Sequence, residues 1–161
     1  RRLDHGIANE NNAVATLVSQ VMPVFFPNCV LQEEGCYTLM NNDTLIYVVS
    51  PDGSIRSNGK AEYAVEIKCP YPDPNNPRKL PVFYELPKYY VVQVMLEMKV
   101  LNVDKLLLVC YSAKTTVVSV VDFSKDLWQT IWDVTLELYG AVKPVKPSSL
   151  LESVKTLREQ V

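Results

Sequence analysis

Apolar residues recur at helical spacing near the start of the chain. From about Ile7 to Met22 they fall at every third or fourth position and form one stripe, which predicts an amphipathic helix. The stripe consists of Ala13, Val14, Leu17, Val18 and Val21. Pro23 and Pro27 are expected to end this helix, because proline lacks the backbone N–H that continues it.

Short runs of β-branched and aromatic residues predict strands. These runs cover residues 30–38, with a break at Gly35, and residues 45–49, 63–68, 105–111 and 115–123. Turn-forming residues separate them, at Ser50-Pro51-Asp52-Gly53 and at Ser57-Asn58-Gly59. We expect a hairpin that joins the strand at 45–49 to the strand at 63–68.

The second half of the chain adds helices to these strands. A segment from about Pro87 to Asn102 is apolar on nearly all sides and predicts a buried helix, after an irregular stretch with six prolines. A third helix is expected at 124–138, ended by Gly140, and a final polar helix at about 148–160, after a linker at Pro144–Pro147. This order predicts an α/β domain, mixed α+β, with a central mixed sheet flanked by helices.

Length and composition indicate a single globular domain. A chain of 161 residues with 48% hydrophobic and 21% charged residues fits one domain, with its core at about 6–139. The chain starts at Arg1 without a methionine, and we expect that it was excised from a longer protein. No apolar run approaches the roughly 20 residues that a membrane span needs, so we expect no membrane partner.

Charge and cysteine content exclude several classes of site. A net charge of −2 is a poor match to an obvious nucleic-acid binder, although an acidic metal cluster lowers the total. Four cysteines and one histidine follow no common zinc or iron–sulfur spacing. Scattered free thiols are typical of a reducing, intracellular compartment, nuclear or cytoplasmic.

Two carboxylates and an amine carry the candidate chemistry. Side chains two apart on a strand point the same way, so Glu66 and Lys68 share a face while Ile67 points into apolar packing. The expected hairpin brings Asp52 beside Glu66. Two acids at one point can hold a hard cation such as Mg²⁺, and an adjacent lysine can orient or deprotonate a water. This set is the minimum for metal-assisted phosphodiester hydrolysis.

Each of these residues also has an ordinary structural interpretation. Asp52 alone is typical of a turn, and Glu66 with Lys68 is typical of solvent-facing cross-strand pairs. Glu10 lies in the first two turns of the predicted helix, where an anion suits the helix dipole. Gln93 on a buried helix requires hydrogen-bond partners, as a structural bridge or as a site residue.

Four sequence words in fixed order strengthen the functional interpretation. They are Gly6-Ile7-Ala8-Asn9-Glu10-Asn11-Asn12-Ala13, Ser50-Pro51-Asp52-Gly53, Glu66-Ile67-Lys68-Cys69-Pro70-Tyr71 and Tyr90-Val91-Val92-Gln93-Val94. From about Gly6 to Phe123 the chain resembles the YqaJ-like viral recombinase family, the family of phage lambda exonuclease, within the PD-(D/E)xK nucleases. The resemblance implies a restriction-endonuclease-like core.

The resemblance also implies an activity and a site. The activity is Mg²⁺- or Mn²⁺-dependent exonucleolytic hydrolysis of DNA, with one or two ions, 5′ to 3′ on double-stranded ends, in recombination and repair. It implies that Glu10, Asp52, Glu66 and the carbonyl of Ile67 lie at the metal, that Lys68 positions or activates water and that Gln93 lines the site. Whether Lys68 acts as a base or as an electrostatic stabiliser stays open.

Partners and alternatives follow from the same resemblance. It allows a homo-oligomer, which is a trimer in the best-known relative, a single-strand annealing protein as a partner, and a viral or mobile-element origin. The alternatives are a non-catalytic DNA-binding or assembly module and a PD-(D/E)xK endonuclease. The family carries a further acid before the Ser-Pro-Asp-Gly word, for which Asp43 is the nearest residue, and an upstream arginine, for which Arg1 or Arg2 stands nearest.

Overall fold

A five-stranded mixed sheet forms the centre of the protein. The computed structural model describes residues 2–139 and 152–161. The strands are β1 (Val30–Glu33), β4 (Gly53–Ser57), β5 (Lys60–Lys68), β6 (Lys105–Tyr111) and β7 (Thr116–Asp122), in the order β1-β4-β5-β6-β7. β5 and β6 are parallel and the other neighbours are antiparallel. The predicted α/β class with a mixed sheet is therefore confirmed.

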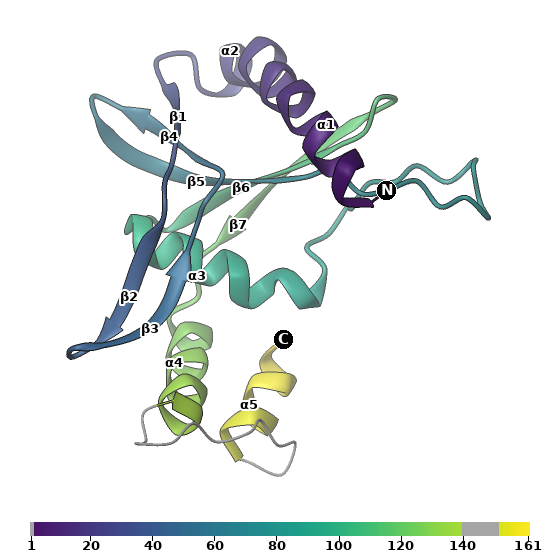
Figure 1. Ribbon diagram of the computed structural model, residues 1–161. Coiled ribbons are helices and arrows are strands. Elements are labelled where there is room, and N and C mark those ends of the chain that lie inside the picture. The colour runs from purple at the N-terminus through teal and green to yellow at the C-terminus, as the bar shows by residue number, and fades with distance from the viewer. Residues whose placement is uncertain (1, 140–151) are drawn as a thin grey trace.

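Helices cover both faces of this sheet (Figure 1). One face carries α1 (Arg2–Thr16), which continues through a π-helical turn, η1 (Leu17–Val21), into α2 (Met22–Phe25). The other face carries α3 (Val91–Leu101), which follows the short 3₁₀ helix η2 (Lys88–Tyr90). The long segment between β5 and η2 contains no helix or strand, as its prolines predict.

The alternation of side chains along β5 determines which of its residues pack under α1 and which pack under α3. Val65 packs with Leu107 and Leu17 in the core under α1, whereas Ala64 packs with Met98 in the core under α3. Since successive strand residues point to opposite faces, residues 64, 66 and 68 of β5 share the face towards α3. Glu66 and Lys68 are therefore directed towards α3, and Ile67 packs against the α1 core.

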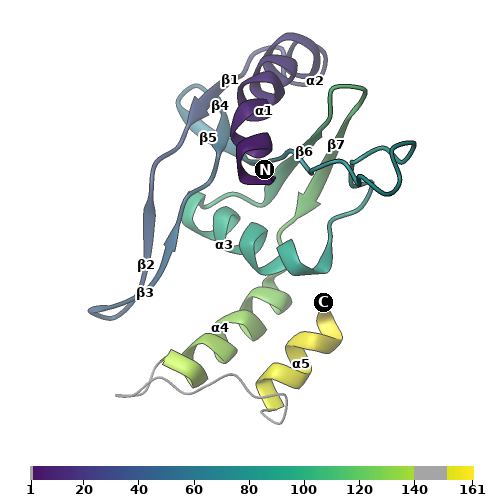
Figure 2. The same cartoon turned by 45° about the vertical axis from the view of Figure 1, so that its right-hand side comes forward.

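A second, two-stranded sheet stands beside α3. It consists of β2 (Tyr37–Asn41) and β3 (Thr44–Val49), paired antiparallel. The hydroxyl of Tyr47 lies 2.7 Å from the hydroxyl of Thr135 in α4 (Lys125–Tyr139), which ties the hairpin to that helix. The helix α5 (Glu152–Gln160) packs alongside α4 (Figure 2). None of the helices that the structure describes has the length and apolar character needed to cross a membrane.

The first helix differs from its predicted bounds. It begins at Arg2 rather than Ile7 and does not end at Pro23, because helical structure continues to Phe25. Pro23 lies in the first turn of α2, where the missing N–H is tolerated. Glu10 consequently lies in the third turn of α1, beyond the turn where the dipole favours an anion, so its predicted place in the first two turns is wrong.

The predicted hairpin is also wrong in its partner. Residues 53–57, which lie between the two predicted turns and were assigned to no strand, form β4, and β4 rather than β3 pairs with β5. The turn lies at Asn58 and Gly59, whose positive φ values of 51° and 79° match the two-residue turn that an Asn-Gly pair favours. The predicted strand at 30–38 divides near Gly35 into β1 and β2, which belong to different sheets.

The later elements agree with the prediction to within a few residues. These are α3, β6, β7 and α4. The predicted stop at Gly140, the linker at Pro144–Pro147 and residues 148–151 of the last predicted helix lie outside the described residues.

Candidate active site

A cleft of about 740 Å³ opens at the end of β5. Its walls come from the first half of α1, the Asp52 turn, the end of β5 with the residues that follow it, and η2. Carboxylates, a lysine and aromatic rings line it together. These include Arg2, Glu10, Asp52, Glu66, Ile67, Lys68, Tyr71, Phe83, Tyr89 and Tyr90.

The pairing of β4 with β5 places Asp52 beside Glu66. Gly53 pairs with Val65, so the residue before Gly53 lies level with the residue after Val65. The side chain of Asp52 accepts a hydrogen bond of 2.7 Å from the backbone N–H of Ile67. Gly53 is needed here because a Cβ on it would lie 2.9 Å from the carbonyl oxygen of Gln32 on β1. The predicted approach of Asp52 to Glu66 is thus present, through a different strand pair.

Glu66 and Lys68 form a close ion pair on the α3 face. The Nζ of Lys68 lies 2.6 Å from Oε1 of Glu66, and both side chains are largely buried. Lys68 also lies over the ring of Tyr90, 4.2 Å from its centroid, a cation–π distance. The amine is therefore held between a carboxylate and an aromatic ring at the wall of the cleft.

Gln93 bridges these groups from α3. Its Nε2 donates to Glu66 Oε1 at 2.9 Å and to Glu97 Oε1 at 3.3 Å, and its Oε1 lies 3.4 Å from Lys68 Nζ. The buried amide thus has the partners that its position requires. Gln93 supports Glu66 and Lys68 from behind and is not among the residues that line the cleft.

Glu97 is a site-associated residue that sequence reasoning missed. Its side chain is 1% exposed, and its Oε2 is buried without a hydrogen-bond partner. It lies four residues after Gln93, one helical turn further along the same face. The sequence contained a signal for this role, since Glu97 is a second polar residue one turn after Gln93 on a largely apolar helix.

The carboxylates destabilise one another's charged forms. Burial, followed by the negative charge of Glu66, raises the pKa of Asp52 from 3.8 to about 7, against the lowering effect of the Ile67 hydrogen bond. Burial and the neighbouring Glu66 raise the pKa of Glu97 from 4.5 to about 10. If all of its carboxyl groups were ionised, the site would carry more negative charge than the single ammonium of Lys68 can neutralise.

Lys68 keeps its proton in this environment. Burial alone would lower the pKa of its ammonium, but the hydrogen bond and the charge of Glu66 outweigh burial and raise that pKa above 10.5. Burial and the charge of Glu10 raise the pKa of the neighbouring Cys69 thiol to about 11. Cys69 is therefore a neutral thiol and not a nucleophile, since the thiolate is the reactive form.

The other predicted positions divide into two groups. Glu10 is exposed at the edge of the cleft, where its charge contributes to the raised pKa of Asp52, and Ile67 and Arg2 also line the cleft. Asp43 lies in the turn between β2 and β3 and does not line the cleft. The structure therefore does not bring Asp43 to the site.

The donor set suits a hard cation. Asp52, Glu66 and the main-chain carbonyl of Ile67 offer oxygen ligands, and the raised pKa of Asp52 is the mark of negative charge that a cation would relieve. Within residues 2–139 and 152–161, however, no group of three or more His, Cys, Asp or Glu side chains is placed to hold a metal ion. Asp52 and Glu66 are thus the carboxylates that could hold a cation in the cleft, with Glu10 at its rim.

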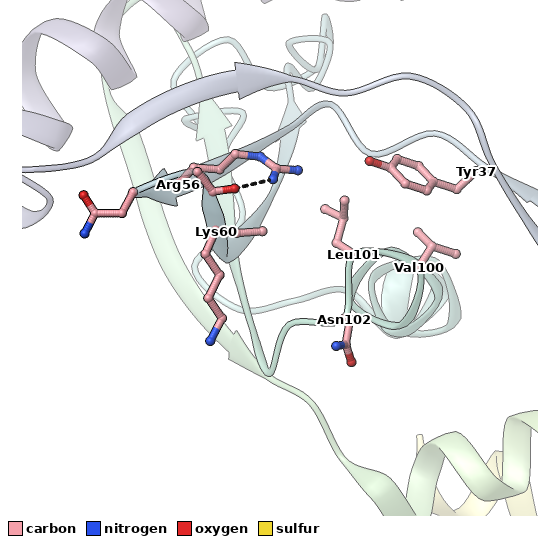
Figure 3. A pocket seen from close by; sticks show the side chains of 9 residues that line it. Tyr37, Arg56, Lys60, Val100, Leu101 and Asn102 are labelled. Carbon is pink, nitrogen blue, oxygen red and sulfur yellow. Dashed lines mark hydrogen bonds between the residues drawn. The ribbon is translucent and has the colours of Figure 1, made fainter.

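A second hollow of about 490 Å³ has a different character (Figure 3). It lies between the β4–β5 turn and the end of α3, where Tyr37, Arg56 and Lys60 contribute side chains. Arg56 is already paired, with Glu34 at 2.7 Å and with the carbonyl of Gly59 at 3.1 Å. Among the described residues that line it none is a carboxylate, so it lacks the donors of a cation site.

Comparisons with known proteins agree with this fold. Residues 5–104 match the sequence profile of the YqaJ-like viral recombinase domain. The crystal structure of an alkaline exonuclease, LHK-Exo, from Laribacter hongkongensis matches with a TM-score of 0.63 and 15% identity, over 99% of this chain and 73% of that one. LHK-Exo in complex with dAMP matches with a TM-score of 0.59 and 16% identity, over 83% and 64%. None of the curated proteins gives a significant match.

Proposed function

The chain belongs to the YqaJ-like viral recombinase domain family, and from this premise we propose that it is a divalent-metal-dependent DNA exonuclease. The proposed reaction is hydrolysis of phosphodiester bonds at double-stranded DNA ends, from 5′ to 3′, in recombination or repair. A fold shared with an alkaline exonuclease, which has also been crystallised with dAMP, supports DNA as the substrate.

One observation carries the proposal: Asp52, Glu66 and Lys68 converge at one cleft. Asp52 reaches Ile67 N at 2.7 Å, and Lys68 reaches Glu66 at 2.6 Å, so all three groups surround the end of one strand. Burial of two acids side by side is costly, because each carboxylate loses its hydration without gaining a full opposite charge. An ordinary cross-strand pair at the surface does not require this cost. The crowding is understandable if the site normally holds a cation.

The proposed division of labour assigns oxygen ligation to Asp52, Glu66 and the Ile67 carbonyl, with Glu10 beside a second ion. Mg²⁺ or Mn²⁺ bound there would polarise the phosphoryl oxygen and lower the pKa of the attacking water. The raised pKa of Lys68 favours the ammonium form, which stabilises the charge that develops on the phosphoryl oxygens. Gln93 then fixes the orientation of Glu66 and Lys68 through its amide.

A cleavage assay tests this function. The protein is incubated with linear DNA and with closed circular DNA, with Mg²⁺, with Mn²⁺ and with a chelator. We expect digestion of linear DNA alone, only with metal, and release of label first from the 5′ end. Nicking of the circles would indicate an endonuclease, and no cleavage of either DNA would indicate a binding module.

Matched variants assign the activity to this cleft. Glu66→Gln and Lys68→Met should abolish cleavage, whereas Glu62→Gln and Lys105→Met should not, because Glu62 is an exposed residue of the same strand and Lys105 is exposed on the next strand. Normal cleavage by Glu66→Gln with intact folding would show that the site lies elsewhere.

A further inference from the structure

Glu97 is a buried acid for which the proposed reaction has no direct use. It lies on α3 among apolar residues of the core, it is 1% exposed, and it does not line the cleft. A carboxyl group in such a place costs free energy through lost hydration, whereas a leucine would fill the same space without that cost. The position therefore calls for a role that only a polar side chain can perform.

Glu97 contacts two residues of the active-site network. Its Oε1 accepts a hydrogen bond of 3.3 Å from the amide nitrogen of Gln93, one helical turn earlier on the same face of α3. Its carboxyl group also hydrogen-bonds to the side chain of Glu66 on β5. Glu97 therefore joins the helix to the strand that carries the candidate metal ligand.

The contact with Glu97 helps to fix the amide of Gln93 in one orientation. Nε2 of Gln93 bonds to Glu66 Oε1 at 2.9 Å as well as to Glu97, so its two N–H groups have two acceptors. The amide oxygen then faces Lys68 Nζ at 3.4 Å. If the amide turned over, its nitrogen would face the ammonium of Lys68 and its oxygen would face the carboxylate of Glu66.

The carboxylate of Glu66 is held in turn by this amide. Its Oε1 lies 2.9 Å from Gln93 Nε2 and 2.6 Å from Lys68 Nζ, so one oxygen has two donors on the side of α3. A carboxylate held in this way keeps a fixed direction towards the cleft. Residues that orient a metal ligand from behind commonly contribute about tenfold to a hundredfold to metal affinity, although they never touch the ion.

We propose that Glu97 is a positioning residue, which holds the amide of Gln93 and thereby fixes the carboxylate of Glu66 for a divalent cation. This rests on the proposed nuclease function and adds a residue to the support of its site. A glutamine at this position can replace Glu97, because its amide offers an acceptor to Gln93 and a donor to Glu66. A leucine of similar size offers neither.

Metal binding and the state of Gln93 are measured separately to test this. Binding of Mn²⁺ to the protein without DNA is measured by electron paramagnetic resonance. The side-chain amide of Gln93 is followed by NMR in chelator, and its signals are identified by their absence in Gln93→Leu. Glu97→Leu should weaken Mn²⁺ binding by about tenfold to a hundredfold and should speed the exchange of the amide hydrogens with solvent. Glu97→Gln should leave both close to the wild type.

Leu101→Ala is the matched control for a general loss of packing. Leu101 is a buried residue of the same helix, one turn further from the site, and packs in the core under α3. This variant should lose stability and keep wild-type Mn²⁺ binding and amide exchange. Wild-type Mn²⁺ affinity in Glu97→Leu, or an equal loss of affinity in Leu101→Ala, would overturn the proposal.

The NMR measurement keeps this proposal separate from the nuclease function. If the wild type binds no Mn²⁺, the metal-dependent function fails, but the exchange of the Gln93 amide still shows whether Glu97 holds it. Faster exchange in Glu97→Leu alone would support the positioning of Gln93 by Glu97, and unchanged exchange would overturn it.

Discussion

Replacing Asp52 by asparagine should stabilise the metal-free protein while it removes activity. Asp52 is held beside Glu66, and folding raises its pKa from 3.8 to about 7. That difference corresponds to roughly 4 kcal/mol of folding free energy, as an upper bound because water in the cleft screens part of the charge. Asparagine removes the charge and keeps an oxygen that can accept the Ile67 N–H.

The effect should depend on pH in one direction. Since folding raises the pKa of Asp52, the folded protein retains a proton that the unfolded chain releases, so the contribution of Asp52 to stability is fully present below about pH 4 and is lost as pH rises to about 7. Asp52→Asn lacks this loss. At pH 8 its midpoint of thermal unfolding should be several degrees higher than that of the wild type, at about 2–4 °C per kcal/mol for a chain of this size.

Thermal and urea unfolding in chelator, from pH 4 to pH 8, measure this difference. Asp43→Asn is the control. Asp43 is exposed in the β2–β3 turn, so this substitution removes an equal charge outside the cleft. Mg²⁺ should then raise the stability of the wild type, by about 2.7 kcal/mol at a concentration of 100 Kd, and leave Asp52→Asn unchanged. Equal stability of wild type and Asp52→Asn at pH 8 without metal would refute the argument that the two acids repel each other.

Three further variants test neighbouring parts of the site. Glu97→Gln should fold with nearly wild-type stability in urea unfolding, because its raised pKa keeps the carboxyl neutral. Glu97→Leu should cost about 1–3 kcal/mol, because it removes the hydrogen bonds that Glu97 makes with Gln93 and Glu66; equal losses would mean that Glu97 is charged. Gly53→Ala should lower stability by about 1–3 kcal/mol, since its Cβ would meet Gln32 O at 2.9 Å, and an unchanged unfolding midpoint would show that β1 can move aside. Gln93→Leu should lower kcat and change KM little, because the amide orients Glu66 and Lys68 and does not line the cleft. An effect on KM alone would contradict this role.

Several parts of the site follow from the sequence by local rules. Alternation along a strand places Glu66 and Lys68 on one face and Ile67 on the other, whatever the strand pairs with. The apolar segment before Asn102 folds as the buried helix α3, and the Asn-Gly pair at 58–59 forms the turn. These features depend on residues within a few positions of one another, so the sequence determines them directly.

Tertiary structure decided which segments meet. The Asn-Gly turn at 58–59 joins β4 directly to β5, but residues 53–57 contain one β-branched residue, Ile55, and so lack the composition that predicts a strand. Burial of Ile55 in the core under α1 accompanies the observed pairing. Glu97 becomes an acid of the site only because α3 packs on the face of β5 that carries Glu66. Contacts between residues far apart in the chain arise from the packing of whole elements, and so only the folded structure brings Asp52, Glu97 and Tyr89 around the end of one strand.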